Sequence, residues 1–140
     1  MATVDRSLQL SAHFTLGEFL SPNDPWAESH FLSSPVTYTA RLKKLCGALE
    51  QVRAHFGNKA ITINSGLRSP QHNKQIGGAQ ASQHMVGQAA DFTVEGVDPH
   101  TVADYCYTLS DLGGVGRYAT WTHADVRQRD VDGQQARWEG

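Results

Sequence analysis

A chain of 140 residues can form one domain with its own hydrophobic core, and we expect a single domain over residues 1–140. Its 39% hydrophobic and 19% charged residues are typical of a globular protein, and the formal net charge of −2 gives no broad attraction to nucleic acid or to an anionic membrane surface. No apolar run reaches membrane-spanning length, and the first residues lack the basic and apolar regions of a secretory signal peptide.

The N-terminal part of the chain is expected to contain little β-structure. Residues 1–13 show no clear period and predict an extended arm, after which Thr15 and Glu18 have the spacing of a capping box and predict one short helix. Residues 21–35 are rich in proline and serine, which predicts a loop. From 36 to about 55, apolar residues recur at intervals of three and four, the pattern of a long amphipathic helix.

The rest of the chain alternates between strands and short helices. The predicted elements are a strand at 60–64, a short helix at 71–76, a strand at 89–94, an amphipathic helix from 98, and a hairpin at 115–126 whose second strand covers 121–127. Residues 128–140 are expected to be a polar tail in which Trp138 packs against the sheet. Together these elements predict an α+β fold with a small, mainly antiparallel sheet and helices on one side.

The two cysteines are expected to be buried and unpaired. Cys46 and Cys106 each lie on the apolar face of a predicted helix, and neither has the CxxC spacing of a metal or redox motif. The chemistry of the protein therefore has to come from histidine, aspartate and arginine.

Three residues suggest a metal site. His84 and Asp91 offer one imidazole nitrogen and one carboxylate oxygen, donors that zinc prefers in catalytic sites, and His123 would complete a set of three protein ligands. This set predicts a zinc peptidase, because zinc with an open coordination position can activate water and polarise a carbonyl group.

Strand geometry explains how these residues could meet. Side chains alternate along 121–127, so one face of that strand carries Trp121, His123, Asp125 and Arg127. Asp91 begins its own strand and can reach His123 if the two strands are neighbours. Trp121 would then border the same cleft, either as a substrate contact or as a packing residue.

The sequence resembles a known peptidase family at these residues. The run Ser82-x-His84-x-x-Gly87-x-Ala89-x-Asp91 follows Ser65-Gly66-x-Arg68-Ser69 and precedes His123-x-Asp125. It is similar to the zinc-dependent D-alanyl-D-alanine carboxypeptidases, which share their fold with the hedgehog signalling domain and with phage endolysins that cut L-alanyl-D-glutamate bonds. The resemblance covers residues 61–127, about half of the chain.

The resemblance implies roles for individual residues. His84, Asp91 and His123 would bind one zinc ion. Arg68 would stabilise negative charge on the scissile carbonyl or hold a substrate carboxylate. The alternative is a purely structural salt bridge with Asp91 or Asp125. Ser82 and Gln83 would line the substrate site.

One position departs from the family pattern. Many members carry Glu or Asp three residues before the last zinc histidine, as the general base, whereas this chain has Thr120 there. The nearest carboxylate on the same strand face is Asp125, and we expect it to act as the general base. The alternative is that it orients a ligand or Arg127.

We therefore expect a monomeric zinc peptidase that hydrolyses the stem peptide of bacterial peptidoglycan, either as a D-Ala-D-Ala carboxypeptidase or as an L-Ala-D-Glu endopeptidase. No nucleic-acid or membrane partner is expected. The resemblance also implies a phage or prophage origin, with release at lysis or association with the virion. The alternatives are a catalytically inactive, zinc-stabilised binding module and a structural phage component of the same fold.

Overall fold

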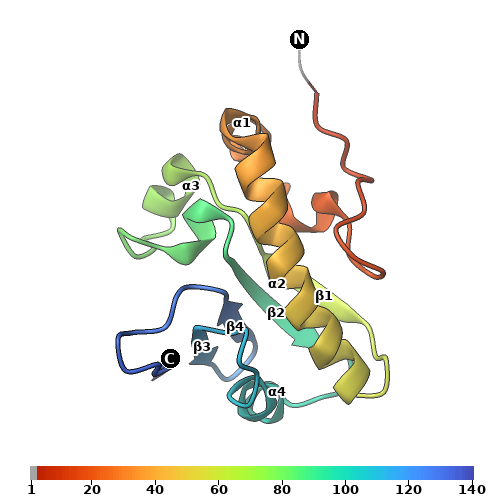
Figure 1. Cartoon of the computed structure of the whole chain (residues 1–140). Coiled ribbons are helices and arrows are strands. Elements are labelled where there is room, and N and C mark those ends of the chain that lie inside the picture. The colour runs from red at the N-terminus through yellow and green to blue at the C-terminus, as the bar shows by residue number, and fades with distance from the viewer. Residues whose placement is uncertain (1–2) are drawn as a thin grey trace.

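The computed structural model describes residues 3–140, so the first two residues of the expected arm lie outside the described part. The elements in chain order are the 3-10 helix η1 (Leu16–Phe19), α1 (Ala27–Ser33), α2 (Pro35–His55), β1 (Ile61–Ser65), α3 (Pro70–Gln75), the 3-10 helix η2 (Gln83–Val86), β2 (Ala89–Val94), α4 (Pro99–Cys106), β3 (Gly114–Arg117), β4 (Thr122–Asp125) and β5 (Ala136–Glu139). Figure 1 shows the long helix α2 crossing the molecule in front of β2.

The five strands form one sheet in the order β1-β2-β4-β3-β5. The pairs β1–β2, β2–β4 and β3–β4 are antiparallel, whereas β3 and β5 are parallel. The predicted α+β class is confirmed, and the sheet is mainly antiparallel as expected, with β5 making it mixed.

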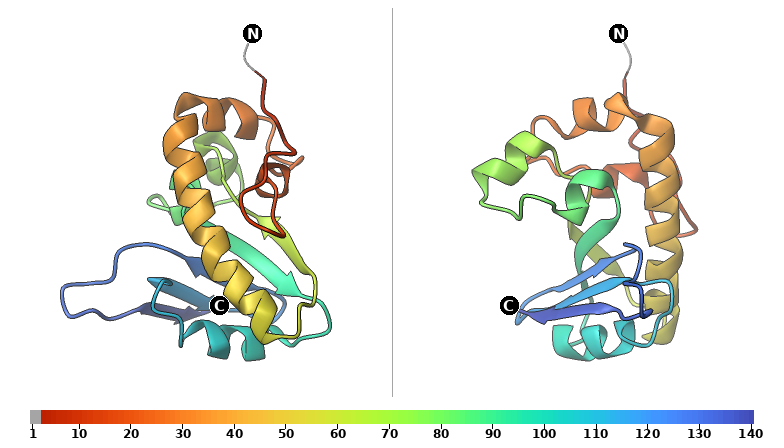
Figure 2. Two further views of the ribbon diagram at one scale, coloured as in Figure 1. Left: turned by 45° about the vertical axis from the view of Figure 1, so that its right-hand side comes forward. Right: turned by 60° about the vertical axis from the view of Figure 1, so that its left-hand side comes forward.

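One face of the sheet carries the hydrophobic core. Ala90, Phe92 and Val94 of β2 alternate with partly exposed residues and are buried together with Val115 of β3 and Ala124 of β4. Helix α2 packs on this face with its buried apolar stripe (Tyr38, Leu42, Leu45, Cys46, Leu49 and Val52), at the spacing that the sequence predicted. Helix α4 lies beside it under β3 and β4 (Figure 2). The opposite face of the central strands is therefore left to polar residues.

The N-terminal segment folds back on the body of the protein. The capping box is confirmed, because the Thr15 backbone N–H donates to the Glu18 carboxylate at 2.7 Å. Gln9 forms an isolated antiparallel bridge with Thr15, and Leu10 is buried in the core.

Two expectations about irregular segments were wrong. Residues 21–35 contain helix α1, which buries Ala27 and Phe31 and so gains tertiary contacts that offset a proline-rich setting. Residues 128–140 are not all tail, because 136–139 pair with β3 as the edge strand β5. Within residues 3–140, no helix has the length and hydropathy required to cross a membrane.

Candidate metal centre

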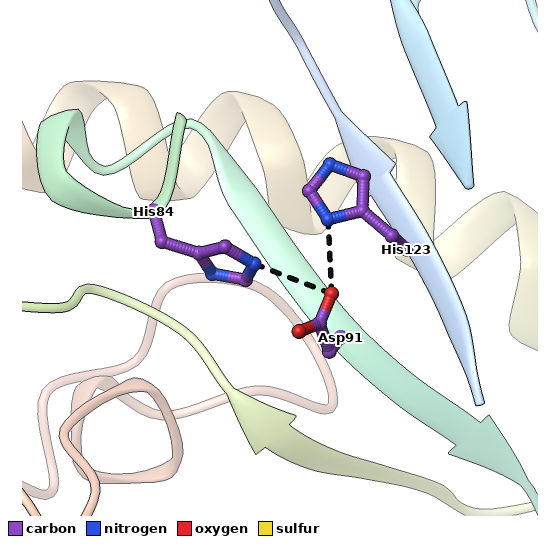
Figure 3. A group of neighbouring side chains, drawn as sticks. All are labelled: His84, Asp91 and His123. Atoms are coloured by element: carbon purple, nitrogen blue, oxygen red, sulfur yellow. Dashed lines mark hydrogen bonds and ion pairs between the residues drawn. The ribbon is translucent and has the colours of Figure 1, made fainter. Parts of the chain in front are cut away.

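Three side chains meet on the face of the sheet opposite to α2 and α4. They are His84 of η2, Asp91 of β2 and His123 of β4 (Figure 3). One possible ligand atom from each lies within 4.8 Å of the other two. Asp91 Oδ1 is 3.2 Å from His84 Nε2 and 2.9 Å from His123 Nδ1. The structure thus brings together the three residues that the sequence suggested as metal ligands.

The strand register explains why two of these residues meet. Asp91 and His123 are directly paired across β2 and β4, so their side chains leave the same face side by side. His84 reaches the same point from η2, whose N-cap is Ser82: the Ser82 hydroxyl accepts a hydrogen bond from the backbone N–H of His84 at 3.2 Å. After η2, Gly87 adopts a positive φ of 76°, which turns the chain into β2.

The spacing of the donors fits a zinc ion. Tetrahedral zinc with bonds of about 2.0–2.1 Å places its ligand atoms roughly 3.3–3.4 Å apart. The 3.2 Å and 2.9 Å distances from the Asp91 oxygen are close to that spacing. Two imidazoles and one carboxylate also form a donor set that suits zinc and leaves room for a fourth ligand.

Hydrogen bonds select which nitrogen of each histidine can bind metal. His84 Nδ1 lies 2.9 Å from the Gly66 carbonyl oxygen, which can only accept, so Nδ1 carries the proton and Nε2 faces Asp91. His123 Nε2 lies 2.7 Å from Asp125 Oδ2, which leaves His123 Nδ1 facing Asp91. The two histidines therefore present opposite ring nitrogens to the centre.

Asp125 lies beneath His123 and is completely buried. Besides the contact with His123, its carboxylate accepts hydrogen bonds from Arg127 Nε at 2.8 Å and Arg127 Nη2 at 2.7 Å. Burial would raise the pKa of Asp125, but the bonds from His123 and Arg127 outweigh it and lower the pKa to about 2. The imidazole ring of His123 separates this carboxylate from Asp91.

The charges of the centre are strongly coupled. Burial opposes ionisation of Asp91, yet hydrogen bonds and charge from His123 and His84 hold the pKa of Asp91 well below its usual range. Burial likewise opposes protonation of His123, but its hydrogen bonds to Asp125 and Asp91 raise the pKa of His123. In the metal-free protein, the two flanking carboxylates therefore favour the protonated form of His123.

Arg68 places a positive charge next to this cluster. Its Nη2 is 3.9 Å from Asp91 Oδ2, and the side chain is fixed by bonds from Nη1 to Asn73 Oδ1 at 2.9 Å and from Nη2 to Ser65 Oγ at 3.0 Å. Burial lowers the pKa of Arg68, although nearby Asp91 and Asp24 oppose that effect. The guanidinium remains charged, since its ordinary pKa of 12.5 is far above neutrality.

A cleft of about 380 Å³ opens over the cluster. Of the suggested substrate-binding residues, Ser82, Gln83 and Trp121 all line it, together with the three candidate ligands and Arg68. Asp125 does not. Thr120, at the position of the usual acid, is exposed in the turn between β3 and β4.

Two aromatic residues of the cleft were not suggested by the sequence as site residues: Tyr118, just after β3, and Trp138 of β5. Tyr118 continues the alternation of Gly114 and Gly116 along β3, a signal that could have placed it on this face. Nothing in the sequence pairs β5 with β3.

Residues of α1 and α2 hold the loop that carries His84. The His30 ring nitrogen Nε2 lies 2.7 Å from the Met85 carbonyl oxygen, and Arg41 Nη1 donates to the Val86 carbonyl at 2.9 Å. These contacts fix η2 through residues that do not line the cleft.

Comparison with known proteins agrees with this geometry. The family model described as Peptidase M15 matches residues 12–125. This chain belongs to the Peptidase M15 family. A zinc D-Ala-D-Ala carboxypeptidase from Streptomyces albus G is 37% identical over 79 residues. That match covers 56% of this chain and 30% of the relative, so this M15 chain matches less than a third of the relative's length.

Proposed function

We propose that this M15 chain is a zinc peptidase that cleaves a peptide bond in the stem peptide of bacterial peptidoglycan. The observation that carries the proposal is the convergence of His84 Nε2, Asp91 Oδ1 and His123 Nδ1 in a cleft also lined by Arg68. The similarity to a zinc D-Ala-D-Ala carboxypeptidase supports the same chemistry.

The three ligands would hold the metal, which when bound supplies a Lewis acid that activates water and polarises a carbonyl. Arg68 would bind the carbonyl oxygen as negative charge builds on it, or a substrate carboxylate. Its bonds to Asn73 and Ser65 fix the guanidinium before substrate arrives, so little reorganisation is needed. Ser82, Gln83 and Trp121 would contact the substrate along the cleft.

For Asp125 we propose the orienting role rather than the role of general base. Its carboxylate is buried, bonded to both His123 and Arg127, and separated from the cleft by the imidazole ring. In that place it would fix the rotation of His123 and increase the basicity of Nδ1 as a ligand.

A second candidate is a zinc-stabilised binding module without hydrolytic activity. It is favoured by one observation: among the described residues lining this cleft, Asp91 is the only carboxylate, and it is a candidate ligand. A binding module would retain the metal and would bind wall peptide without cleaving it.

The two candidates are separated by measuring zinc content and hydrolysis together. We expect about one zinc per chain, release of D-alanine from diacetyl-Lys-D-Ala-D-Ala or of new amine termini from an L-Ala-D-Glu peptide, and loss of both zinc and activity in His123→Ala. His100→Ala changes an exposed histidine at the start of α4 and is the matched control. Zinc without cleavage of either peptide or of intact wall would favour the binding module, and no bound zinc would refute both.

The choice between carboxypeptidase and endopeptidase action follows from which peptide is cut. Cleavage of intact wall would also fit the phage lysis or virion-associated setting that we propose with it.

A further inference from the structure

A row of four residues crosses the sheet through the candidate metal centre. Asp91 of β2 pairs with His123 of β4, His123 pairs with Gly116 of β3, and Gly116 pairs with Trp138 of β5. Paired residues on neighbouring strands project from the same face of a sheet. Trp138 therefore stands on the same face as the candidate ligands, two strands away from His123.

Gly116 lets Trp138 reach across that distance. A Cβ atom at residue 116 would lie 2.6 Å from Trp138 Nε1 and 2.8 Å from Tyr118 Cε2, so no side chain fits between them. The Trp138 ring leans over the glycine until its centroid is 5.0 Å from that of His123. Arg127 covers the same indole, with its guanidinium carbon 5.1 Å from the ring centroid.

The indole nitrogen of Trp138 is used to fix a second aromatic side chain. Trp138 Nε1 donates a hydrogen bond to the Tyr118 hydroxyl oxygen at 2.8 Å. The Tyr118 ring is also stacked on Trp121, with centroids 4.4 Å apart and planes 13° apart. Tyr118 is thus held through both its ring and its oxygen at the wall of the cleft.

This arrangement leaves the Tyr118 proton available. The hydroxyl oxygen accepts from an indole, which can only donate, so the tyrosine must direct its own O–H elsewhere. Across residues 3–140, no group accepts that proton in a hydrogen bond. An O–H group whose oxygen already accepts a bond is also a stronger donor.

We propose that the Tyr118 hydroxyl donates a hydrogen bond to a carbonyl or carboxylate oxygen of the peptide substrate, and that Trp138 is a positioning residue acting through Tyr118. The inference rests on the proposed peptidase function and extends it to Trp138, which lies beyond the family match that ends at residue 125. The edge strand β5 thereby contributes to substrate binding although it carries no candidate metal ligand.

The test uses Tyr118→Phe, Trp138→Phe and the double variant in the zinc-loaded protein. Each single change keeps an aromatic ring and removes one hydrogen-bonding group. We expect KM for diacetyl-Lys-D-Ala-D-Ala to rise about 3- to 10-fold in each single variant, the effect of one neutral hydrogen bond, with little change in kcat or zinc content. KM of the double variant should be no higher than that of Tyr118→Phe, because Trp138 acts through the Tyr118 hydroxyl.

A second readout does not depend on turnover. The phosphinate analogue of acetyl-D-Ala-D-Ala cannot be hydrolysed, and its dissociation constant from calorimetry should rise by the same factor in the same variants. Tyr105→Phe is the matched control, since Tyr105 stacks on His55, which does not line this cleft.

The outcomes separate this inference from the proposed function. Unchanged KM and analogue binding in Tyr118→Phe, or additive effects in the double variant, would overturn the inference and leave the peptidase intact. Analogue binding that weakens in the variants of a protein without hydrolytic activity would support the inference and refute the peptidase. A wild type that neither cleaves the peptide nor binds the analogue would overturn both.

Discussion

The carboxylate of Asp125 lies 2.7 Å from His123 Nε2, on the opposite side of the imidazole ring from Asp91. Both residues come from β4, where alternation places them on one face. Rotation of the His123 ring would break this bond. Asp125 therefore fixes the orientation in which His123 Nδ1 faces the candidate metal centre.

Replacing this carboxylate should weaken metal binding without removing a ligand. We expect Asp125→Asn to lower zinc affinity by roughly 10- to 100-fold, the usual effect of losing the partner of a metal-binding histidine. Competition with a chromogenic chelator measures the affinity. Asp132→Asn, at an exposed position, should leave it unchanged; an equal loss in both variants would contradict an orienting role for Asp125.

Zinc binding should release a proton from His123. The flanking carboxylates raise the pKa of this histidine above its ordinary 6.5, so in the metal-free protein the proton on Nδ1 competes with zinc. Apparent affinity should therefore fall as pH decreases through the raised pKa and level off above it. Calorimetry in buffers of different ionisation enthalpy counts the protons released. Zinc affinity that does not depend on pH between 6 and 8 would show that His123 is neutral before the metal binds.

Substitution by alanine should destabilise the protein at Gly114 of β3 but not at Gly47 of α2. A Cβ at Gly114 would lie 2.5 Å from Asp125 Oδ2 and 2.7 Å from Arg127 Nε, both fixed by hydrogen bonds. We expect Gly114→Ala to lower the free energy of unfolding by about 1–3 kcal/mol.

Gly47 is the matched control, because it is exposed within α2 and nothing lies within 4 Å of a Cβ there. Gly47→Ala should raise the free energy of unfolding by about 0.5–1 kcal/mol. Denaturant titration of both variants measures the difference. Equal effects would mean that β3 can move away from the Asp125 carboxylate.

The cysteine thiols should be inert in the folded protein. Burial raises the pKa of both Cys46 and Cys106 to about 12, so almost no thiolate forms near neutral pH. A thiol reagent should label neither residue until the protein unfolds, when both should react. Because the unfolded thiols ionise near 9.0, stability should fall as pH rises above that value, and Cys106→Ala should reduce the loss. Rapid labelling of the native protein would instead indicate local opening of α2 or α4.

The candidate centre was largely predictable because its residues follow local rules. Alternation along 121–127 placed His123 and Asp125 on one face, and the structure joins them by a hydrogen bond. Pairing of β2 with β4 then brings Asp91 to His123. The sequence could not decide the role of Asp125, because the choice depends on whether its carboxylate reaches the cleft or is covered by His123 and Arg127.

The edge strand β5 could not be predicted in the same way. Four residues, 136–139, carry no pattern of their own, and their parallel pairing with β3 depends on contacts distant in sequence. Helix α1 was missed for a related reason: its stability comes from burying Ala27 and Phe31 rather than from its own propensity. Trp138 was missed as a site residue because its contacts depend on this unpredicted pairing, whereas alternation along β3 could have placed Tyr118 on the face of the candidate ligands.

The last residue described lies next to Tyr118, which lines the cleft. The backbone N–H of Gly140 donates to the Arg117 carbonyl at 3.1 Å, and a Cβ at Gly140 would overlap the Tyr118 ring. Any polypeptide joined to residue 140 therefore leaves the molecule beside the Tyr118 ring, whereas the described chain begins at the opposite end of the molecule from the C-terminus (Figure 1). Purification tags, surface-immobilisation handles and fluorescent fusions for this protein belong at the N-terminal end, where they leave Tyr118 and the mouth of the cleft undisturbed.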